Sequence, residues 1–442
     1  MLDIKFIREN PDVIKEAVKK RGMHFDVDFL LGSDEKRRAA ILERDELRAK
    51  QNAISDAIAK LGSDEREKKI KESKALKESL LEAEKRVAAT EEEFSELMHR
   101  LPNIPHPDVP EGTDENDNKV IREWGKPKDF SFKARDHVEI GKILDLIDIE
   151  RAAKVAGTRF NYLKGEAALL EFALVQFVFQ TLTSKETIQK IARDRKLTVS
   201  DTPFIPVVPP VMIRPDLFQR MGRLNPEDKD ERYYLQQDDM YLIGSAEHTL
   251  GSMHADESIP EEKLPIRYIG FSTSFRREAG SYGKDTRGIL RVHQFDKLEM
   301  ESFSAPESSY EEHMLLGAIQ EYLTQALEIP YRVVLICAGD MGKPNARQSD
   351  IEMWMPGEGR YRETHTADYM TDFQARRLNT KVRRTSGDTE FLHTNDATAF
   401  AIGRTLIAIL ENYQEEDGSV VVPEVLRPYM NGIEKISRDK NA

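Results

Sequence analysis

The stretch "FRREAGSYGKDTRGILRVHQFDKLEM", residues 275–300, decides how the second half of this chain folds. It carries six Lys/Arg and four Asp/Glu residues, yet apolar and polar positions alternate on both sides of it. Such alternation is typical of a strand with one buried face. The turn-rich segment "GSYGKDTRG" in the middle therefore predicts a β-hairpin, with strands "GFSTSFRREA" (270–279) and "ILRVHQFDKLEM" (289–300).

Successive side chains of a strand point to opposite faces. One face of the second predicted strand is polar apart from a single ring, and it carries Arg291, His293, Phe295, Lys297 and Glu299. Arg276 and Glu278 share a face of the first predicted strand. The pattern predicts that the apolar face packs on a core and that the polar face is the floor of a site. A solvated outer sheet face with cross-strand ion pairs is the alternative.

An arginine, an aromatic ring and a carboxylate on one floor suit a nucleotide that carries a small polar group. Arginine neutralises phosphate, and a phenyl ring can stack on a base. Phe295 and Glu299 are four residues apart, roughly 13 Å at ~3.4 Å per residue, about the reach of an adenylate with a small acyl group. Arg404 is the single charge in "AFAIGRTLIAIL", residues 399–410, which predicts a helix. Its burial requires an anion, either a structural carboxylate or a phosphate.

The composition limits the classes of protein to consider. With 442 residues, 39% hydrophobic and 33% charged, the chain has room for two or three soluble domains. We expect no membrane span, because no apolar run reaches about 18 residues. The N-terminus lacks the apolar core of a signal peptide, which predicts a cytoplasmic location. Cys337 is the one cysteine, so we expect neither an internal disulfide nor a cysteine-based zinc site.

Residues 35–100 contain no proline and only one glycine, Gly62. Apolar residues recur every seven positions in two series, Ala40, Leu47, Ile54, Leu61 and Leu80, Val87, Phe94, Leu101. This pattern predicts two long helices folded back on each other as an antiparallel coiled coil. The distal third, residues 60–77, has seven basic and four acidic side chains. A net charge of −13 argues against general nucleic-acid binding but leaves room for a local basic patch, with a solvated helical face as the alternative.

Residues 101–118, "LPNIPHPDVPEGTDENDN", contain four prolines and are interpreted as a linker. After them, strand-like and helix-like segments alternate with many turns, which predicts an α+β domain. The segment "GEAALLEFALVQFVFQTL" (165–182) is predicted to be an apolar helix. The proline-rich segment "TPFIPVVPPVM" (202–212) suits an edge strand or an interface.

At this point the sequence resembles the bacterial-type seryl-tRNA synthetases, which are class II aminoacyl-tRNA synthetases. The resemblance runs along nearly the whole chain, from "MLDIKFIRENPDVIKEAVKKRG" to "VPEVLRPYMNG". The stretch 275–299 resembles motif 2 of the class, "PFIPVVPPVM" resembles motif 1 and "AFAIGRTL" resembles motif 3. The motif 2 match is highly specific at that length.

The resemblance implies an antiparallel catalytic sheet of six or more strands with flanking helices, in a catalytic domain at 113–442. Residues 1–112 would be a tRNA-binding domain with a long helical arm. The implied reaction joins serine and ATP into seryl-adenylate and pyrophosphate, then transfers serine to tRNA(Ser), and also to tRNA(Sec). The implied assembly is a homodimer with motif 1, around Pro209 and Pro210, at the interface. The arm would grip the tRNA locally and by shape, as is common in RNA recognition.

The resemblance also implies roles for individual residues. The catalytic residues would be Arg276 on the α-phosphate, Arg404 against the γ-phosphate, and Glu363, which would bind Mg²⁺ together with Thr366. ATP would be held by Arg276, Arg277, Glu278, Val292, Phe295, Glu363, Thr366 and Arg404. Serine would be held by Ser245, Ala246, Glu247, Glu299, Asp396 and Thr398. On the arm, tRNA would be contacted by Lys60, Arg66, Lys68, Lys69, Lys71 and Lys74.

Three segments depart from the family pattern. Asp396, in "HTNDATAFAIGR", stands where the family commonly has an asparagine, Ser245 replaces a threonine, and "ETHTADY" (363–369) replaces a common E-x-S-S-x-S-N. The Asp396 change adds a charge and removes a donor. This change leaves another small amino acid as an alternative substrate. Separate alternatives are an enzyme of the same fold with a carrier protein as acceptor, and a non-catalytic synthetase-like regulator. His293 and His393 are interpreted as structural, hydrogen-bonded histidines, and "QARR" (374–377) as an interior or interface cluster.

Overall fold

The computed structural model describes residues 1–58, 62–224, 226–279 and 287–438. They belong to two compact units, Met1–Ile104 and Pro105–Ala442. The division falls inside the proline-rich stretch that follows the predicted arm. Proline cannot continue a helix, so a sequence with several prolines in succession ends the arm there.

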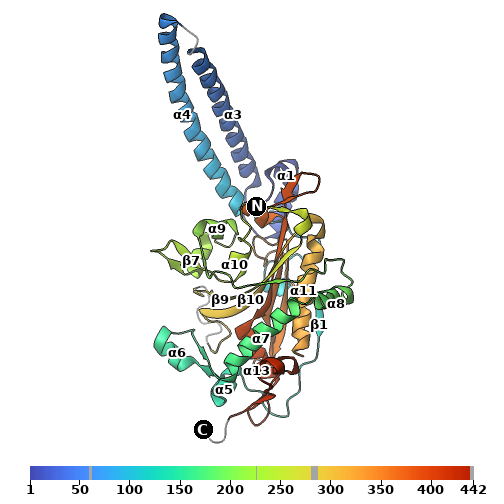
Figure 1. The fold of residues 1–442 in the computed structure, drawn as a ribbon. Coiled ribbons are helices and arrows are strands. Elements are labelled where there is room, and N and C mark those ends of the chain that lie inside the picture. The colour runs from blue at the N-terminus through green and yellow to red at the C-terminus, as the bar shows by residue number, and fades with distance from the viewer. Residues whose placement is uncertain (59–61, 225, 280–286, 439–442) are drawn as a thin grey trace. The chain divides into compact units, whose positions relative to one another are not determined.

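The first unit consists of helices α1 (Ile4–Glu9), α2 (Pro11–Lys20), α3 (Val27–Ile58) and α4 (Ser63–Arg100). Figure 1 shows α3 and α4 as two long helices side by side. Ala40 and Val87 are buried along the seam, and the ion pairs Arg48–Glu84 and Arg86–Glu43, each 2.7 Å, join the helices. The predicted coiled-coil arm is confirmed, with its first helix beginning at Val27. Leu61 of the heptad series lies outside the described residues.

The second unit is built on an eight-stranded sheet in the order β1-β11-β12-β13-β16-β10-β9-β4. All neighbours are antiparallel except β4, which runs parallel to β9 at one edge. The predicted α+β fold with an antiparallel catalytic sheet is thereby confirmed. The strands are β1 (Lys119–Trp124), β4 (Ile205–Val207), β9 (Ile266–Phe275), β10 (Gln294–Ser304), β11 (Tyr331–Leu335), β12 (Arg347–Met355), β13 (Arg360–Tyr369) and β16 (His393–Ala401).

One face of this sheet packs on the main hydrophobic core. Helices α7 (Glu166–Leu182), α11 (Ser309–Ala326) and α13 (Ile402–Asn412) supply the other side of that core (Figure 1). Leu298 and Met300 of β10 point into it. Because side chains alternate, Lys297 and Glu299 are on the opposite face of β10, as the sequence pattern predicts. That opposite face carries the site described below.

Smaller elements complete the second unit. Its other helices are α5 (His137–Ile143), α6 (Ile149–Ala156), α8 (Lys185–Asp194), α9 (Pro215–Arg220), α10 (Glu247–Leu250) and α12 (Phe373–Leu378). Its small sheets contain β2 (Ile147–Asp148) with β3 (Tyr162–Leu163); β5 (Met212–Ile213), β7 (Met240–Leu242) and β6 (Tyr234–Leu235); β15 (Thr389–Phe391), β14 (Lys381–Arg383) and β8 (Ser258–Pro260); and β17 (Val420–Val421) with β18 (Lys435–Ile436).

The hairpin around motif 2 is shorter than predicted. β9 ends at Phe275 and β10 begins at Gln294, so Arg276, Glu278 and Arg291 lie in the connecting segment. Backbone groups there bond to other parts of the chain: the amide of Arg277 donates to the carbonyl of Glu231, and that of His293 to the carbonyl of Arg159. Beyond one cross-strand bond, from the amide of Arg276 to the carbonyl of His293, tertiary contacts thus replace the ladder that alternation alone predicts. Part of the turn, 280–286, lies outside the described residues.

Two further segments can be compared with expectation. The apolar segment 165–182 forms α7, and the proline-rich segment supplies the edge strand β4, as predicted. The helix predicted from Ala399 begins only at Ile402, because β16 continues to Ala401. In the described parts of the chain, no helix by itself has the length and apolar composition to cross a membrane; α7 and α8 reach them only as a pair bent by 78°.

Candidate active site

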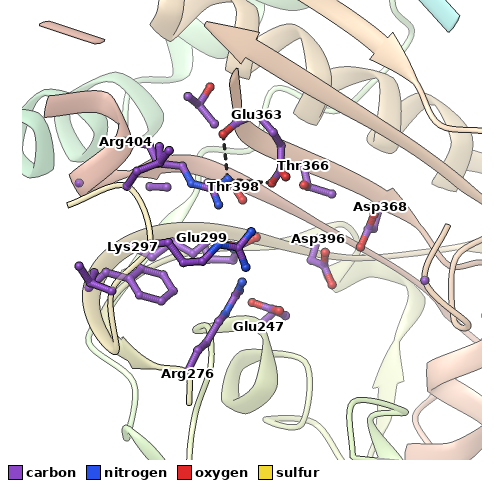
Figure 2. A pocket seen from close by; sticks show the side chains of 18 of the residues that line it. Glu247, Arg276, Lys297, Glu299, Glu363, Thr366, Asp368, Asp396, Thr398 and Arg404 are labelled. Carbon is purple, nitrogen blue, oxygen red and sulfur yellow. Dashed lines mark hydrogen bonds and ion pairs between the residues drawn. The ribbon is translucent and has the colours of Figure 1, made fainter. Parts of the chain in front are cut away.

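A cavity of about 280 Å³ opens on the sheet face opposite the core. Side chains from β10, β12, β13 and β16 form its floor. Its walls come from the segments that flank these strands, from Arg223 after α9 and from Glu247 of α10. Figure 2 shows that the labelled side chains converge on this space from several elements. We call the part around Phe295 and Val292 the aromatic end, and the part around Glu247, Glu299 and Asp396 the acidic end.

The aromatic end places a guanidinium group beside a ring. The Arg276 guanidinium carbon lies 5.2 Å from the centroid of the Phe295 ring, within the range of a cation–π contact. Its Nε donates to the carbonyl of Gly244 at 3.1 Å, which fixes the direction of the side chain. Nearby, Arg291 pairs with Glu278 at 2.7 Å. Arg276 thus reaches into the cavity from the end of β9 and lies between the aromatic and acidic ends (Figure 2).

A second arginine enters from the first turn of α13. Nη1 of Arg404 donates to the carbonyl of Glu363 at 2.8 Å and to its carboxylate Oε1 at 3.0 Å (Figure 2). The anion that the sequence analysis requires for Arg404 is therefore a carboxylate of the chain itself. Desolvation opposes the ionisation of Glu363, yet the guanidinium groups of Arg404 and Arg276 hold its pKa below the usual value. The pair lines the cavity and remains partly accessible.

The acidic end is organised around Lys297. Its ammonium lies 2.5 Å from Oε2 of Glu299 and donates to Oγ of Ser245 at 2.9 Å. Ser245 in turn donates to Oε2 of Glu299 at 3.3 Å, so the three groups form one closed network. Burial raises the pKa of Glu299 to about 7 against the opposing charge of Lys297. Burial acts on Glu247 in the same direction, but Lys297 and His248 outweigh it and lower the pKa of Glu247.

Asp396 is paired within the chain. Nη2 of Arg223 lies 3.1 Å from Oδ2 of Asp396 and 3.2 Å from Oδ2 of Asp368, so one guanidinium bridges two carboxylates. Asp396 and Asp368 are directly opposite each other on β16 and β13. The charge that departs from the family pattern therefore has its counter-charge in a residue that sequence analysis missed. Arg223 lies after α9, far from both aspartates in sequence, and no local pattern marks it.

Most of the predicted site residues meet in this cavity. It is lined by Glu247, Arg276, Glu278, Val292, Phe295, Glu299, Glu363, Thr366, Asp396, Thr398 and Arg404. Three predicted residues are not among those that line it: Arg277, Ser245 and Ala246. The guanidinium carbon of Arg277 instead lies 5.6 Å from the centroid of the Tyr233 ring. Ser245 and Ala246 are buried beneath the floor, where Ser245 supports Lys297 and Glu299.

The histidines near the site have structural partners. Nδ1 of His293 lies 3.0 Å from the carbonyl oxygen of Arg276, and Nδ1 of His393 lies 2.7 Å from Oγ of Ser309. Burial lowers the pKa of His365 to about 3, so this imidazole stays neutral near pH 7. In "QARR", Gln374 and Arg377 are buried, and Nε of Arg377 donates to the carbonyl of Arg220. These contacts agree with an interior, supporting cluster.

The residues expected to bind magnesium have donor atoms that suit this ion. Glu363 and Thr366 both present oxygen atoms, the donors that Mg²⁺ prefers, to the cavity. Directly across from Thr366 on β12, Asp350 has a buried Oδ1 without a hydrogen-bond partner. The donor set therefore fits a hard cation bound together with a polyphosphate. Over the described ranges, no group of three or more His, Cys, Asp or Glu side chains is arranged to hold a metal by itself.

The basic residues of the predicted arm lie on α4. Arg66, Lys68, Lys71 and Lys74 are exposed, and Lys69 pairs with Glu72 at 2.6 Å. Lys60 lies outside the described residues. Four positive side chains at positions 66, 68, 71 and 74 cover about two turns of the helix and are open to a ligand.

Comparisons with known proteins agree with this geometry. Residues 1–105 match the seryl-tRNA synthetase N-terminal domain, and residues 232–413 match the tRNA synthetase class II core domain (G, H, P, S and T). The serine–tRNA ligase of Dictyoglomus turgidum is 44% identical over 444 residues, which cover 100% of both chains.

Two solved structures are similar over the full length. The seryl-tRNA synthetase of Pyrococcus horikoshii, crystallised with ATP, has a TM-score of 0.86 and 39% identity, with 100% of both chains covered. The cytoplasmic serine–tRNA ligase of Naegleria fowleri, in complex with AMP, has a TM-score of 0.83 and 30% identity, with 100% of this chain and 99% of that chain covered.

Proposed function

This chain belongs to the seryl-tRNA synthetase family, and from that membership we propose which of its residues carry each part of the reaction. The reaction is the ATP-dependent ligation of serine to tRNA by a class II aminoacyl-tRNA synthetase. It proceeds through seryl-adenylate with release of pyrophosphate, after which the seryl group passes to tRNA and AMP leaves. We assign the aromatic end of the cavity to ATP and the acidic end to serine.

The adenine base stacks on Phe295 at the aromatic end, with the backbone around Val292 and the carboxylate of Glu278 at its edge. Arg277, which is outside the cavity lining, joins ATP binding only at its rim. A phenyl ring offers a large apolar contact to the flat base. Support comes from the position of Arg276 beside this ring, because an arginine 5.2 Å from the ring centroid is well placed for the phosphate that follows the nucleoside.

Catalysis of adenylate formation rests on positioning and charge. The serine carboxylate attacks the α-phosphorus in line, and pyrophosphate leaves, so the protein supplies no nucleophile. Arg276 neutralises the α-phosphate, and Arg404 exchanges part of its bonding to Glu363 for the γ-phosphate. Glu363 holds Mg²⁺ with help from Thr366; the ion, when bound, adds positive charge to the triphosphate. The low pKa of Glu363 keeps this ligand ionised in the working pH range.

Serine lies at the acidic end. Glu247, whose pKa is lowered, receives the α-ammonium group, with the Asp396 carboxyl as a second acceptor and Thr398 as a hydroxyl contact. Glu299 accepts the serine hydroxyl. Alanine and glycine have no hydroxyl to donate to this carboxylate and lose that charge-assisted hydrogen bond, which is worth about 1–3 kcal/mol. Ser245 and Ala246 act from below the floor, where Ser245 orients Lys297 and Glu299.

The partners follow from the two units. The domain at 1–112 binds the acceptor tRNA(Ser), and tRNA(Sec) as a second acceptor, through basic side chains around the distal part of the arm: Arg66, Lys68, Lys69, Lys71 and Lys74. Lys60 belongs to the same proposal. Phosphate contacts by such a patch are local, so the overall charge of −13 does not oppose them. We assign the protein to the cytoplasm, where its substrates are used.

A homodimer through motif 1 completes the assembly. β4 ends the sheet, so its outer edge has no strand neighbour among the described residues. Ile205 is 53% and Val208 is 79% exposed, and Pro209 and Pro210 follow directly. Exposed apolar residues on an edge strand favour contact with another chain, here a second copy.

The observation that carries this assignment is Arg276, which lies between an aromatic ring and a buried, lysine-paired glutamate in one cavity. The test is ATP–pyrophosphate exchange without tRNA, with serine, threonine, alanine, glycine and cysteine offered separately. We expect exchange dominated by serine, with a smaller signal from threonine, because one extra methyl group is discriminated by only about 1–3 kcal/mol. Exchange led by another amino acid, or none at all, would contradict the assignment.

A further inference from the structure

We propose that Arg223 is a specificity-determining residue: it occupies the cation position of the acidic end and so restricts the cavity to amino acids with an uncharged side chain. This inference rests on the proposed function, because it concerns the same cavity. Its basis is a row of acids that crosses three neighbouring strands.

The row consists of Glu301 on β10, Asp396 on β16 and Asp368 on β13. Strand pairing places Glu301 directly opposite Asp396, and Asp396 directly opposite Asp368. Residues opposite each other in an antiparallel pair project to the same face with Cβ atoms about 4.5–5.5 Å apart. All three side chains are buried. Like charges in this arrangement repel, so the row requires either protons or a cation.

Arg223 is that cation, and it comes from outside the sheet. Its Nη2 contacts Oδ2 of both aspartates, at 3.1 Å and 3.2 Å, and its side chain is only 18% exposed. The third acid, Glu301, has no hydrogen-bond partner for either oxygen, and burial raises its pKa well above the ordinary value. Burial also raises the pKa of Asp396 and of Asp368, and the charge of Arg223 opposes that shift at both aspartates. One guanidinium therefore serves the two aspartates.

The row lies beside the groups assigned to serine. Asp396 and Thr398 are two residues apart on one face of β16, and Thr398 is directly opposite Glu299. Arg223, Asp368 and Asp396 all line the cavity. A substrate side chain at this end of the cavity therefore shares it with the guanidinium of Arg223, in addition to the Lys297 ammonium that pairs with Glu299. A hydroxyl group tolerates that neighbour, whereas a second ammonium group meets a cation that is already bound to the acids.

The sharpest probe is β-aminoalanine, which is serine with an amine in place of the hydroxyl. In Arg223→Gln the aspartates lose their cation and gain affinity for a substrate amine. We expect the ratio of kcat/KM for β-aminoalanine to that for serine, measured by ATP–pyrophosphate exchange, to rise at least about tenfold over the native enzyme. The KM for ATP should change less than about twofold, since the aromatic end is untouched. General distortion of the cavity would instead raise the KM for ATP and leave the ratio unmoved.

Three further variants serve as controls for this change in the kcat/KM ratio. Arg223→Lys keeps a cation among the acids and should keep the native ratio. Arg223→Gln/Asp368→Asn/Asp396→Asn removes both aspartates together with the cation and should return the ratio towards the native value. Arg384→Gln is the matched control, because Arg384 is also 18% exposed and also binds several carboxylates, but outside the cavity. It should leave the ratio unchanged.

The outcomes separate the inference from the proposed function. A native enzyme without serine-dependent exchange defeats the proposed function. An active native enzyme with an Arg223→Gln ratio within about twofold of native overturns the inference alone. If Arg223→Gln does not fold, Arg223→Gln/Asp368→Asn leaves one unpaired carboxylate instead of two, and the same gain of β-aminoalanine activity is expected from it. Loss of that gain in the folded double variant overturns the inference equally.

Discussion

The Lys297 ammonium lies 2.5 Å from Oε2 of Glu299 at the floor of the cavity, and both side chains are buried. This pairing places an ionisable carboxylate where the serine hydroxyl is proposed to bind, and burial still raises its pKa to about 7. The acceptor strength of the site therefore changes within the range of pH in which the enzyme can be assayed.

The KM for serine should depend on pH through Glu299. A raised pKa means that the carboxyl is protonated below pH 7 and ionised above it, so a strong, charged acceptor for the serine hydroxyl is replaced by a weaker, neutral one as pH falls. For a group with a pKa of about 7, the ionised fraction falls about tenfold between pH 8 and pH 6, and KM for serine should rise by a similar factor. Steady-state exchange kinetics at the two pH values measure this, and Glu299→Gln should abolish the dependence. A pH-dependent KM that survives in Glu299→Gln would point to another group.

The arm variant Lys68→Ala/Lys71→Ala/Lys74→Ala should separate the two half-reactions. Removing three phosphate-binding charges weakens tRNA binding and lowers its dependence on salt, with a slope of log affinity against log salt smaller by about 3. Serine-dependent exchange should be unchanged, because it needs no tRNA. Lys85→Ala, an exposed lysine on the same helix outside the patch, is the control and should leave tRNA aminoacylation as it is. Equal loss in the control would mean that the patch has no special role.

The edge strand supplies a test of the assembly. Val208→Glu places a charge on a side chain that is 79% exposed in the single chain, so the folded subunit should tolerate it. If a second copy covers β4, the buried charge costs several kcal/mol at the interface, and the dimer should dissociate. Analytical ultracentrifugation should report a dimer for the native protein and a monomer for the variant. An unchanged sedimentation coefficient in Val208→Glu would contradict an interface at this strand.

A buried ion pair away from the cavity should control stability. Arg267 is fully buried and binds Glu312 through two bonds, Nη2–Oε1 at 2.6 Å and Nε–Oε2 at 2.8 Å. Arg267→Ala leaves Glu312 buried without its counter-charge and should lower the free energy of unfolding by about 3–5 kcal/mol. Arg48→Ala removes an exposed pair with Glu84 and should cost less than about 1 kcal/mol. Urea unfolding checks both values, and similar losses in the two variants would contradict the role of burial.

β10 shows which features of the site can be predicted from the sequence and which cannot. A period of two predicts correctly that Lys297 and Glu299 face the site while Leu298 and Met300 face the core, because the alternation of side chains is a local property of any strand. The same pattern wrongly predicts that the strand already includes Arg291, whereas β10 begins at Gln294. Hydrogen bonds to remote backbone groups, rather than the local pattern, decide where the strand pairing ends.

The role of Arg223 could not be predicted from the sequence. Arg223 is a single arginine in a turn-rich segment, and nothing around it distinguishes it from other surface arginines. Only the fold brings it to Asp368 and Asp396, which are 145 and 173 residues later in the chain. Asp396 itself is conspicuous as a departure from the family pattern, but its partner is a tertiary relationship. The prediction that Arg404 has an anionic partner is confirmed, whereas the identity of that partner, Glu363, also depends on the fold.

The central claim is that this cavity makes seryl-adenylate between Phe295 and Glu299 with Arg276 on the phosphate. The most direct measurement is to incubate the enzyme with ATP, Mg²⁺ and an equimolar mixture of amino acids without tRNA, and to identify the bound adenylate by mass spectrometry after a rapid quench. We predict close to one seryl-adenylate per subunit in the native enzyme and at least about a hundredfold less in Arg276→Ala. The exposed Arg193 gives a control, Arg193→Ala, with native yield. A native yield of seryl-adenylate in Arg276→Ala, or an adenylate of another amino acid in the native enzyme, would contradict the account.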